Sequence, residues 1–309
     1  MWRSGSPAGG HVDLSALVAA VREPADDTLI PVGHGTRSVA VPGRPVSAPA
    51  GIVEFEPAEM TLRCGAATPL DDLHAAVAAV GQELALPVGG TVGGALAVGH
   101  SDVLRLGRGA VRDCLLQVRF VTASGVEVRA GGPTVKNVSG FDLCRLMVGS
   151  RGTLGVMGEV IVRTRPRPAV RQWFTTDAPP ERLLPTLYRP ISVLWDGTRC
   201  WVCLEGHPDD VADEQHRAGL AEIDGPPALP DGARWSVAPS RWREVQGSGR
   251  FVMELGVGVV HHERAPRVGV DPVVSLPPRV RRLNDELKRQ FDPTRRWNPQ
   301  IDVAGGEPT

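Results

Sequence analysis

Apolar residues recur at intervals of three and four in three segments of the chain, as they do along one face of an amphipathic helix. Asp13 can cap the first helix, and Pro69 with Asp71 marks the first turn of the second. The third pattern covers residues 278–291. The three predicted buried stripes are Leu14, Leu17, Val18 and Val21; Leu70, Leu73, Val77 and Val80; and Val280, Leu283, Leu287 and Phe291.

Shorter apolar or alternating runs, bounded by turn residues, indicate strands. In the first half these are 28–32, 52–56, 60–64, 82–86 and a hairpin of 115–121 with 126–129. After the Pro-rich run 163–168 the composition shifts, and we expect strands at 172–176, 191–195, 199–204, 234–238 and 251–260, with a helix at 209–220. The chain therefore predicts an α+β fold with a first domain over 1–168, a small antiparallel domain inserted over 169–275, and a C-terminal helix and tail over 276–309 that return to the first domain.

Two glycine-rich loops, 31–37 and 87–97, each follow a predicted strand. Glycine allows positive φ and leaves backbone N–H groups uncovered, so several amides can converge on one anion. Thr91 adds a hydroxyl donor between two glycine pairs, although an isolated run of this kind can also be a simple turn. Neither loop has the spacing of a Rossmann or P-loop motif. Two such loops suggest one long, doubly phosphorylated ligand.

Composition excludes several classes of protein. The 34 basic and 35 acidic residues leave a net charge of −1, which favours neither nucleic acid nor anionic lipid as a partner. No apolar run is long enough to span a membrane, and the first residues lack the apolar region of a signal peptide, so we expect a cytoplasmic protein. The 5 cysteines suit buried thiols better than disulfides, and Cys200 with Cys203 lacks a second pair of metal ligands.

Three motifs carry a family resemblance. The runs 136–143 (KNVSGFDL), 149–155 (GSRGTLG) and 291–299 (FDPTRRWNP) stand in the order found in the FAD-binding domain of vanillyl-alcohol oxidase-like flavoproteins, the PCMH type. Among these flavoproteins, the chain most resembles the FAD-binding subunits of bacterial glycolate oxidases. Ser139, Phe141 and Gln300 depart from the usual motifs.

The resemblance implies an FAD-binding domain of two α/β subdomains, followed by a shortened substrate or cap domain. Its implied FAD contacts fall in two pyrophosphate loops, the 136–142 motif and a turn along the flavin. These residues are Pro31, Gly33, His34, Gly35 and Thr36; Gly89, Gly90, Thr91, Gly93 and Gly94; Lys136, Asn137, Gly140 and Asp142; and Gly152, Thr153, Gly155 and Val156. Some relatives attach FAD through a histidine, but here Gly35 holds the matching position and His34 falls one place early, so non-covalent FAD is expected.

The implied activity is oxidation of a small 2-hydroxy acid such as glycolate or D-lactate, by hydride transfer to flavin N5. Such a reaction needs a base for the hydroxyl proton and a cation for the carboxylate. His261 and His262 are the candidate bases, and strand alternation places them on opposite faces, so at most one can serve. An exposed pair at the end of a strand is an equally good interpretation. Arg243, Arg250 and Arg264 are candidate cations.

In the family, the FAD subunit works beside a second flavoprotein subunit and a separate iron–sulfur subunit. The chain has no cysteine run for a cluster, so that partner would be another polypeptide, and complex formation could make the protein peripheral to the inner membrane. Two alternatives remain open. One is a degenerate FAD-binding subunit for assembly or electron relay without its own substrate site, and a more distant one is a cell-wall precursor reductase of the same fold.

Overall fold

The computed structural model describes residues 10–23, 27–36, 42–133, 142–245, 249–264 and 277–301. The chain forms two compact units. The first consists of Met1–Ser101, Val111–Arg167 and Leu276–Thr309, and the second of Asp102–Ala110 and Pro168–Ser275. Residues 102–110, which the sequence placed in the first domain, belong to the second unit because Val103 and Leu104 pack in its core and Gly107 N–H donates to Ile191 O (3.2 Å).

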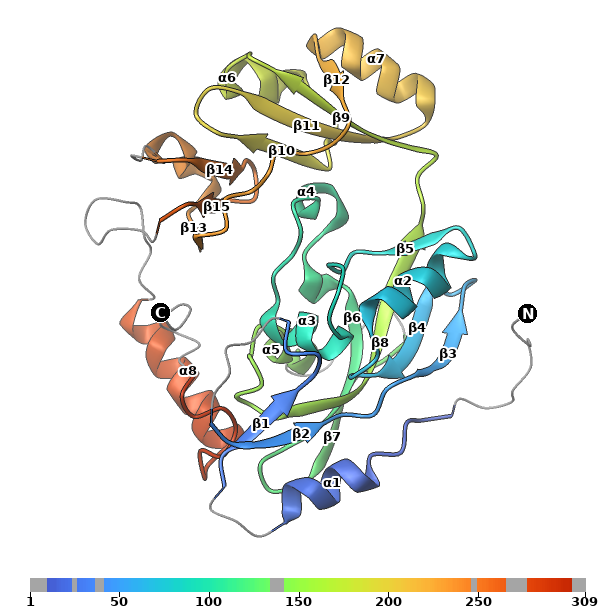
Figure 1. The fold of residues 1–309 in the computed structure, drawn as a ribbon, viewed down its shortest axis with the longest axis vertical. Coiled ribbons are helices and arrows are strands. Elements are labelled where there is room, and N and C mark those ends of the chain that lie inside the picture. The colour runs from blue at the N-terminus through green and yellow to red at the C-terminus, as the bar shows by residue number, and fades with distance from the viewer. Residues whose placement is uncertain are drawn as a thin grey trace. The chain divides into compact units, whose positions relative to one another are not determined.

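An antiparallel sheet forms the centre of the first unit (Figure 1). Its strand order is β3-β4-β8-β6-β7, and the short strand β5 also pairs with β8. The long strand β8 therefore contacts three other strands. The strands are β3 (Ile52–Glu56), β4 (Thr61–Gly65), β5 (Gln82–Leu84), β6 (Leu115–Val121), β7 (Glu127–Gly131) and β8 (Val156–Pro166).

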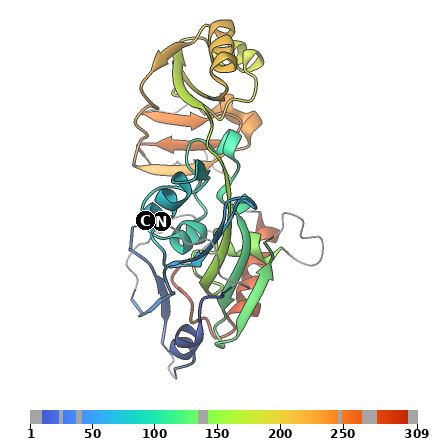
Figure 2. The same ribbon diagram turned by 90° about the vertical axis from the view of Figure 1, so that its right-hand side faces the viewer.

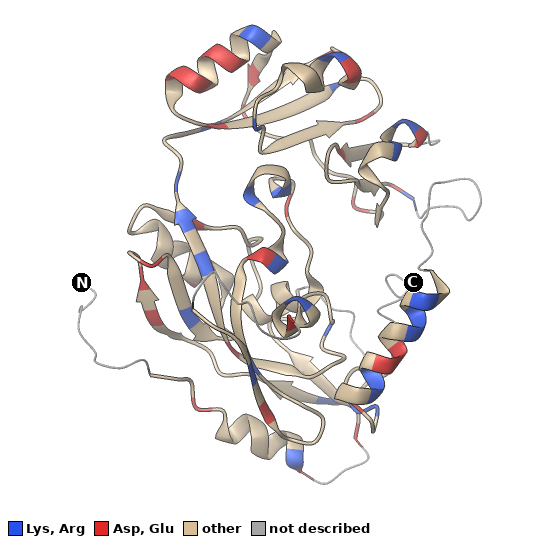
Figure 3. Cartoon of the chain, turned by 180° about the vertical axis from the view of Figure 1, so that it is seen from behind, with Lys and Arg blue, Asp and Glu red and all other residues tan. Residues whose placement is uncertain are grey.

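A separate parallel pair, β1 (Leu29–Val32) with β2 (Arg44–Ser47), lies in the same unit. Short helices accompany these strands: α1 (Ser15–Arg22), α2 (Leu70–Ala78), α3 (Val92–Val98), η1 (Val111–Asp113), α5 (Leu143–Met147) and α8 (Pro278–Phe291). The predicted stripes of α1 and α2 are buried, except that Val18 is half-buried and Val80 is 49% exposed because α2 ends at Ala78. The stripe predicted for α8 was wrong, since no residue of that helix is buried and Leu283 is 54% exposed. Figure 3 shows both signs of charge along α8.

The core of the first unit lies between the sheet and helices α2, α3 and α5. Phe120, Leu70, Leu96 and Met147 are fully buried there. A second cluster joins α1, β1 and Trp297, whose side chain is 0% exposed. The C-terminal segment that follows α8 is thereby packed into the first unit.

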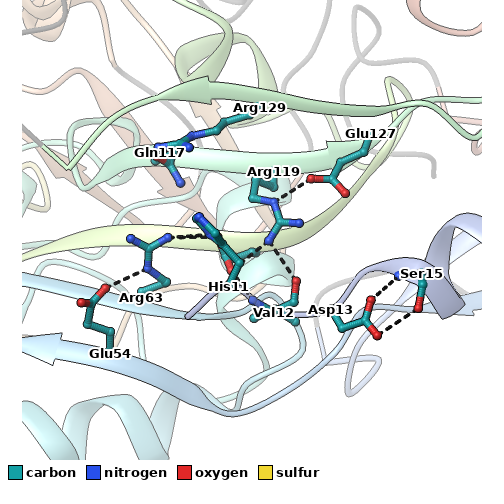
Figure 4. Close-up of polar contacts among 11 residues, drawn as sticks. His11, Val12, Asp13, Ser15, Glu54, Arg63, Gln117, Arg119, Glu127 and Arg129 are labelled. Carbon is teal, nitrogen blue, oxygen red and sulfur yellow. Dashed lines mark hydrogen bonds and ion pairs between the residues drawn. The ribbon is translucent and has the colours of Figure 1, made fainter. Parts of the chain in front are cut away.

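One buried carboxylate holds the segment before α1 against the sheet. Glu159 on β8 is fully buried and accepts hydrogen bonds from Val12 N–H (2.5 Å) and Arg119 Nη1 (3.1 Å). His11 Nδ1 lies 3.1 Å from Glu159 Oε1 and 2.9 Å from Arg63 Nη1. Each arginine also has an outer partner, Glu54 for Arg63 and Glu127 for Arg119 (Figure 4).

These contacts fix the charge of Glu159. Burial raises the pKa of this carboxyl, but hydrogen bonds from Val12 N–H and His11 and the charge of Arg119 outweigh burial, so its pKa lies below the ordinary value. The ionised form is therefore the one that the fold stabilises.

A seven-stranded antiparallel sheet forms the second unit, in the order β12-β9-β11-β10-β14-β15-β13. Figure 2 shows β13, β14 and β15 of this sheet in orange. The strands are β9 (Val170–Thr176), β10 (Ser192–Trp195), β11 (Cys200–Gly206), β12 (Ala221–Ile223), β13 (Ala233–Ser236), β14 (Phe251–Glu254) and β15 (Val259–His262). The helices are α4 (Arg105–Arg108), α6 (Pro180–Leu183), η2 (Leu184–Thr186), α7 (Pro208–Ala218) and η3 (Pro239–Glu244).

The single strand expected over residues 251–260 was wrong. Gly256 and Gly258 have φ of +79° and +82°, so the chain turns there and β14 and β15 pair as a hairpin. The expected helix at 209–220 forms as α7, with Asp209 and Asp210 in its first turn and Arg217 in its last, as the helix dipole favours. Figure 3 shows α7 as mainly acidic.

All 5 cysteines are free and buried. Cys64, Cys114 and Cys144 lie in the first unit, and Cys200 and Cys203 in the second. Burial raises the pKa of Cys64, Cys200 and Cys203 to about 12 each and that of Cys144 to about 11. Among the described residues no group of three potential metal ligands gathers, and no described helix is long and apolar enough to cross a membrane.

Candidate functional site

The first unit contains a cavity of about 410 Å³. Its walls come from stretches far apart in the sequence: the loop after β1, the start of α3, the turn before β8 and the segment after α8. Most of the predicted cofactor residues that the structure describes line it. They are Pro31, Gly33, His34, Gly35, Thr36, Thr91, Gly93, Gly94, Gly152, Gly155 and Val156.

The two glycine-rich loops are in direct contact. A Cβ at Gly33 would lie 2.5 Å from Thr91 Oγ1, so glycine is required for the first loop to approach the second. The sequence predicted that both loops serve one ligand, and this contact brings them to the same cavity.

The first loop offers backbone donors. Residues 33–36 are exposed, and their N–H groups make no hydrogen bond to another described residue. Gly35 has a φ of +68°, which turns the backbone sharply in the middle of the loop. The loop can therefore present several amides to an anion.

The second loop differs from the prediction that its amides converge on an anion. Gly93 N–H donates to Ala66 O (2.8 Å), and Gly94 N–H donates to Thr91 Oγ1 (3.2 Å), which caps α3. Gly89 N–H donates to Asp71 (3.2 Å). A Cβ at Gly93 would lie 2.7 Å from Ala66 O, so Gly93 allows the start of α3 to pack closely against the backbone at Ala66.

The turn before β8 forms another wall of the cavity, and its backbone has two consecutive residues with positive φ. Arg151 and Gly152 have φ of +50° and +69°. A Cβ at Gly152 would lie 2.8 Å from Pro31 Cγ and 2.9 Å from Asn298 Nδ2. The turn therefore touches both the first loop and the C-terminal segment.

Other predicted residues do not line the cavity. Gly89 and Gly90 shape the second loop with φ of +71° and +67°, and Thr153 is buried with its hydroxyl donating to Ser150 O (2.7 Å). Asp142 is exposed and caps α5 by accepting Arg145 N–H (3.0 Å). Lys136, Asn137 and Gly140 lie outside the described residues.

Sequence reasoning missed part of the lining. Small residues from other elements, among them Ala48, Ala66 and Ala97, complete the apolar wall, and Asn298 adds an amide. An isolated alanine gives no signal in a sequence. Asn298 does lie in the family motif at residues 291–299, but the similarity of that motif did not indicate a role for this residue.

The two candidate bases lie on β15 in the second unit and point to opposite faces, as alternation predicts. His261 Nε2 lies 2.8 Å from Glu254 Oε1, with the side chains 12% and 2% exposed. His262 lies between the rings of Trp235 and Phe251, and its Nδ1 accepts Arg264 N–H (2.9 Å). Neither is the exposed strand-end histidine of the alternative interpretation.

Residues 13–131 match the family model described as an FAD binding domain, so the cavity belongs to a flavoprotein. Glycolate oxidase subunit GlcE of Escherichia coli is 32% identical over 229 residues, which are 68% of this chain and 65% of that protein. The comparisons therefore show an FAD-binding domain over residues 13–131 and a similarity to a glycolate oxidase subunit, and FAD is the cofactor that such a domain binds.

A second relative is D-lactate dehydrogenase of Archaeoglobus fulgidus, 32% identical over 165 residues, 50% of this chain and 37% of that one. The chain thus spans just under two thirds of the first relative and less of the second. Among solved structures, alkyldihydroxyacetonephosphate synthase has a TM-score of 0.62 at 15% identity, covering 89% of this chain and 73% of that one. This likeness shows that the chain shares the mixed α and β fold of that synthase, as the sequence led us to expect.

The cavity fits the cofactor in its chemistry. FAD needs donors for two phosphates and apolar walls for a ring system. The loop 33–36 supplies the N–H donors, and Ala66, Ala97 and Val156 supply apolar lining. Buried Asn298 Oδ1 has no hydrogen-bond partner among the described residues, which leaves an acceptor for a cofactor N–H or O–H.

Proposed function

We propose that the protein is an FAD-dependent oxidoreductase subunit that oxidises a small 2-hydroxy acid such as glycolate or D-lactate and passes the electrons to a partner subunit or another acceptor. The observation that carries this proposal is the joint presence of the FAD-domain match and a glycolate oxidase subunit as a relative over 68% of the chain. The D-lactate dehydrogenase relative supports the same substrate class.

FAD, when bound, would accept the two electrons and the hydrogen that leave the substrate carbon. The loop 33–36 would hold the pyrophosphate through its N–H groups, and the packing of Gly93 on Ala66 and of Gly152 on Pro31 would fix the walls around the cofactor. The second unit would act as a shortened cap that supplies substrate-binding groups.

His261 is the better candidate for the base. Its Nε2 faces Glu254, so a carboxylate acceptor favours the tautomer with a proton on Nε2 and leaves Nδ1 able to accept one. Nδ1 of His262 already accepts a backbone N–H, and its ring lies against two aromatic rings, which suits a packing role. Glu254 would be a positioning residue for His261.

If His261 is the base, His261→Ala should slow anaerobic reduction of the flavin by the hydroxy acid by about 100-fold, the usual scale for loss of a general base. Stopped-flow absorbance with glycolate and with D-lactate, using the holoprotein and its partner subunits, measures this rate. His262→Ala is the matched control and should retain the wild-type rate. Equal rates for wild type and His261→Ala would place the base elsewhere.

A second candidate function is an FAD-binding subunit for assembly or electron relay without its own substrate site. The burial of both histidines favours this alternative, because a buried side chain is hard for a substrate to reach. The His261 side chain is only 12% exposed, and His262 is 7% exposed. A wild-type flavin that no hydroxy acid reduces, alone or in complex, would support this alternative.

The proposed partners are a second flavoprotein subunit and a separate iron–sulfur subunit. The relatives named as glycolate oxidase subunits GlcE and GlcD support a multi-subunit assembly. The GlcD relative, from Bacillus subtilis, is 39% identical over 82 residues.

We expect the flavin to be released when the protein is denatured. Gly35 occupies the position at which some family members carry an attaching histidine, and a glycine has no side chain to form the bond. After acid precipitation, the visible absorbance of the oxidised flavin should appear in the supernatant. Yellow colour that stays with the washed pellet would show a covalent bond.

A further inference from the structure

The segment after α8 runs beside β1, the strand that leads into the first glycine-rich loop (Figure 1). Leu29 N–H donates to Arg296 O (2.7 Å), and Asn298 N–H donates to Leu29 O (3.1 Å). Trp297 between them is fully buried. The segment is thus bonded to the backbone that carries the loop 33–36.

The same segment also holds the turn before β8. Asn298 Nδ2 donates to Arg151 O (2.7 Å), at the residue before Gly152. Asn298 is 5% exposed and lines the cavity, and its Oδ1 has no partner among the described residues. Because Nδ2 is committed to a carbonyl, Oδ1 is the end of the amide that is left for another donor. A buried amide oxygen without a donor is costly, so a ligand that supplies one gains affinity.

A lysine fixes the position of this segment. Lys288 Nζ on α8 donates to Thr153 O (2.6 Å), Asp292 Oδ2 (2.5 Å) and Trp297 O (2.6 Å), which uses all three of its N–H groups. Asp292 is fully buried and also accepts the N–H groups of Arg296 and Trp297. The turn before β8 and the chain around Asn298 are therefore held by one ammonium group.

We propose that Asn298 is an FAD-binding residue whose Oδ1 accepts a hydrogen bond from an N–H or O–H group of the cofactor, with Lys288 and Asp292 as positioning residues that hold the C-terminal segment in the cavity wall. This inference rests on FAD as the cofactor and on no assumption about the substrate. It makes the C-terminal segment a part of the cofactor site, joined to two of its walls.

The test is equilibrium titration of the flavin-free, full-length protein with FAD, followed by the change in flavin fluorescence. Asn298→Leu keeps the size of the side chain and removes both the acceptor Oδ1 and the donor Nδ2, which binds Arg151 O. The affinity should fall by about 30-fold, the scale for an unmade hydrogen bond to a buried polar group. Gln300→Leu is the matched control, since Gln300 is exposed on the same segment and does not line the cavity. Its affinity should equal that of the wild type.

A second measurement separates a binding role from a purely structural one. If Asn298 only supports the fold, Asn298→Leu should lower the melting temperature of the flavin-free protein clearly more than Gln300→Leu does, with little change in affinity once the protein is folded. If it binds FAD, the affinity of folded Asn298→Leu should fall in addition to any loss of stability from the missing Nδ2–Arg151 O bond, and FAD should slow hydrogen exchange in residues 292–301 of the wild type but less in Asn298→Leu. Wild-type affinity in folded Asn298→Leu overturns the proposal and leaves the oxidoreductase function untouched.

Discussion

Gly152→Ala is expected to weaken FAD binding by about 100-fold, equivalent to about 2.7 kcal/mol. The added Cβ would lie 2.8 Å from Pro31 Cγ and 2.9 Å from Asn298 Nδ2, and the residue has a φ of +69°. The turn can relieve this clash and strain only by moving, and the wall of the cavity moves with it. Titration of the flavin-free variant with FAD gives the affinity directly.

Gly81→Ala is the control for backbone strain. Gly81 has a similar φ of +72°, but a Cβ there would have no atom within 4 Å, and the residue does not line the cavity. This variant should lose about 1–2 kcal/mol of stability and bind FAD as the wild type does. If folded Gly152→Ala also binds FAD with wild-type affinity, the turn before β8 is not part of the cofactor site.

Glu159→Ala should lower the free energy of unfolding by about 3 kcal/mol, the lower end of the range for breaking a buried ion pair. The substitution leaves Arg63 and Arg119 without their shared inner partner and Val12 N–H without an acceptor. Each arginine keeps its outer carboxylate, which is why the lower end applies. Glu127→Gln, which removes only an exposed partner of Arg119, should cost no more than about 1 kcal/mol. Urea denaturation of the three proteins measures the differences, and equal midpoints for wild type and Glu159→Ala would contradict this account.

The contribution of Glu159 should depend on pH with a defined sign. Because the folded-state pKa lies below the ordinary value of 4.5, the stabilisation is complete above that value and is lost as the pH falls through the lower, folded-state pKa. The difference in unfolding free energy between the wild type and Glu159→Gln should therefore be constant near neutral pH and shrink in acid. A difference that grows as the pH falls would show the opposite shift.

Local patterns were sufficient for most of the elements. The apolar spacing of Leu14, Leu17 and Val21 predicted α1, and the alternation around Val118 predicted the β6–β7 hairpin, because both signals lie within one element. The hairpin at residues 251–262 was missed because glycine can continue a strand or turn it, and only the positive φ of Gly256 and Gly258 decides between the two.

The cofactor site was predicted only in part, because only some of its residues belong to a pattern that is visible within one stretch of sequence. Glycine-rich loops are a local signal, and most of their predicted residues line the cavity, although Gly89 and Gly90 do not. The N–H groups of Gly93 and Gly94 were assigned to an anion, but protein acceptors take them. Glu159 and Asn298 gave no local signal of their roles. Their side-chain partners lie up to 148 residues away in sequence, so only the folded chain reveals them.

The buried cysteines give each unit its own natural chemical probe of local opening. A thiol whose pKa is raised to about 11 or 12 and that solvent cannot reach does not react with an alkylating reagent until the structure around it opens. Cys64, Cys114 and Cys144 report on the first unit, and Cys200 and Cys203 on the second. Mass spectrometry of peptides from a single labelled sample can therefore time the opening of the cofactor-binding unit and of the second unit separately, without any engineered probe.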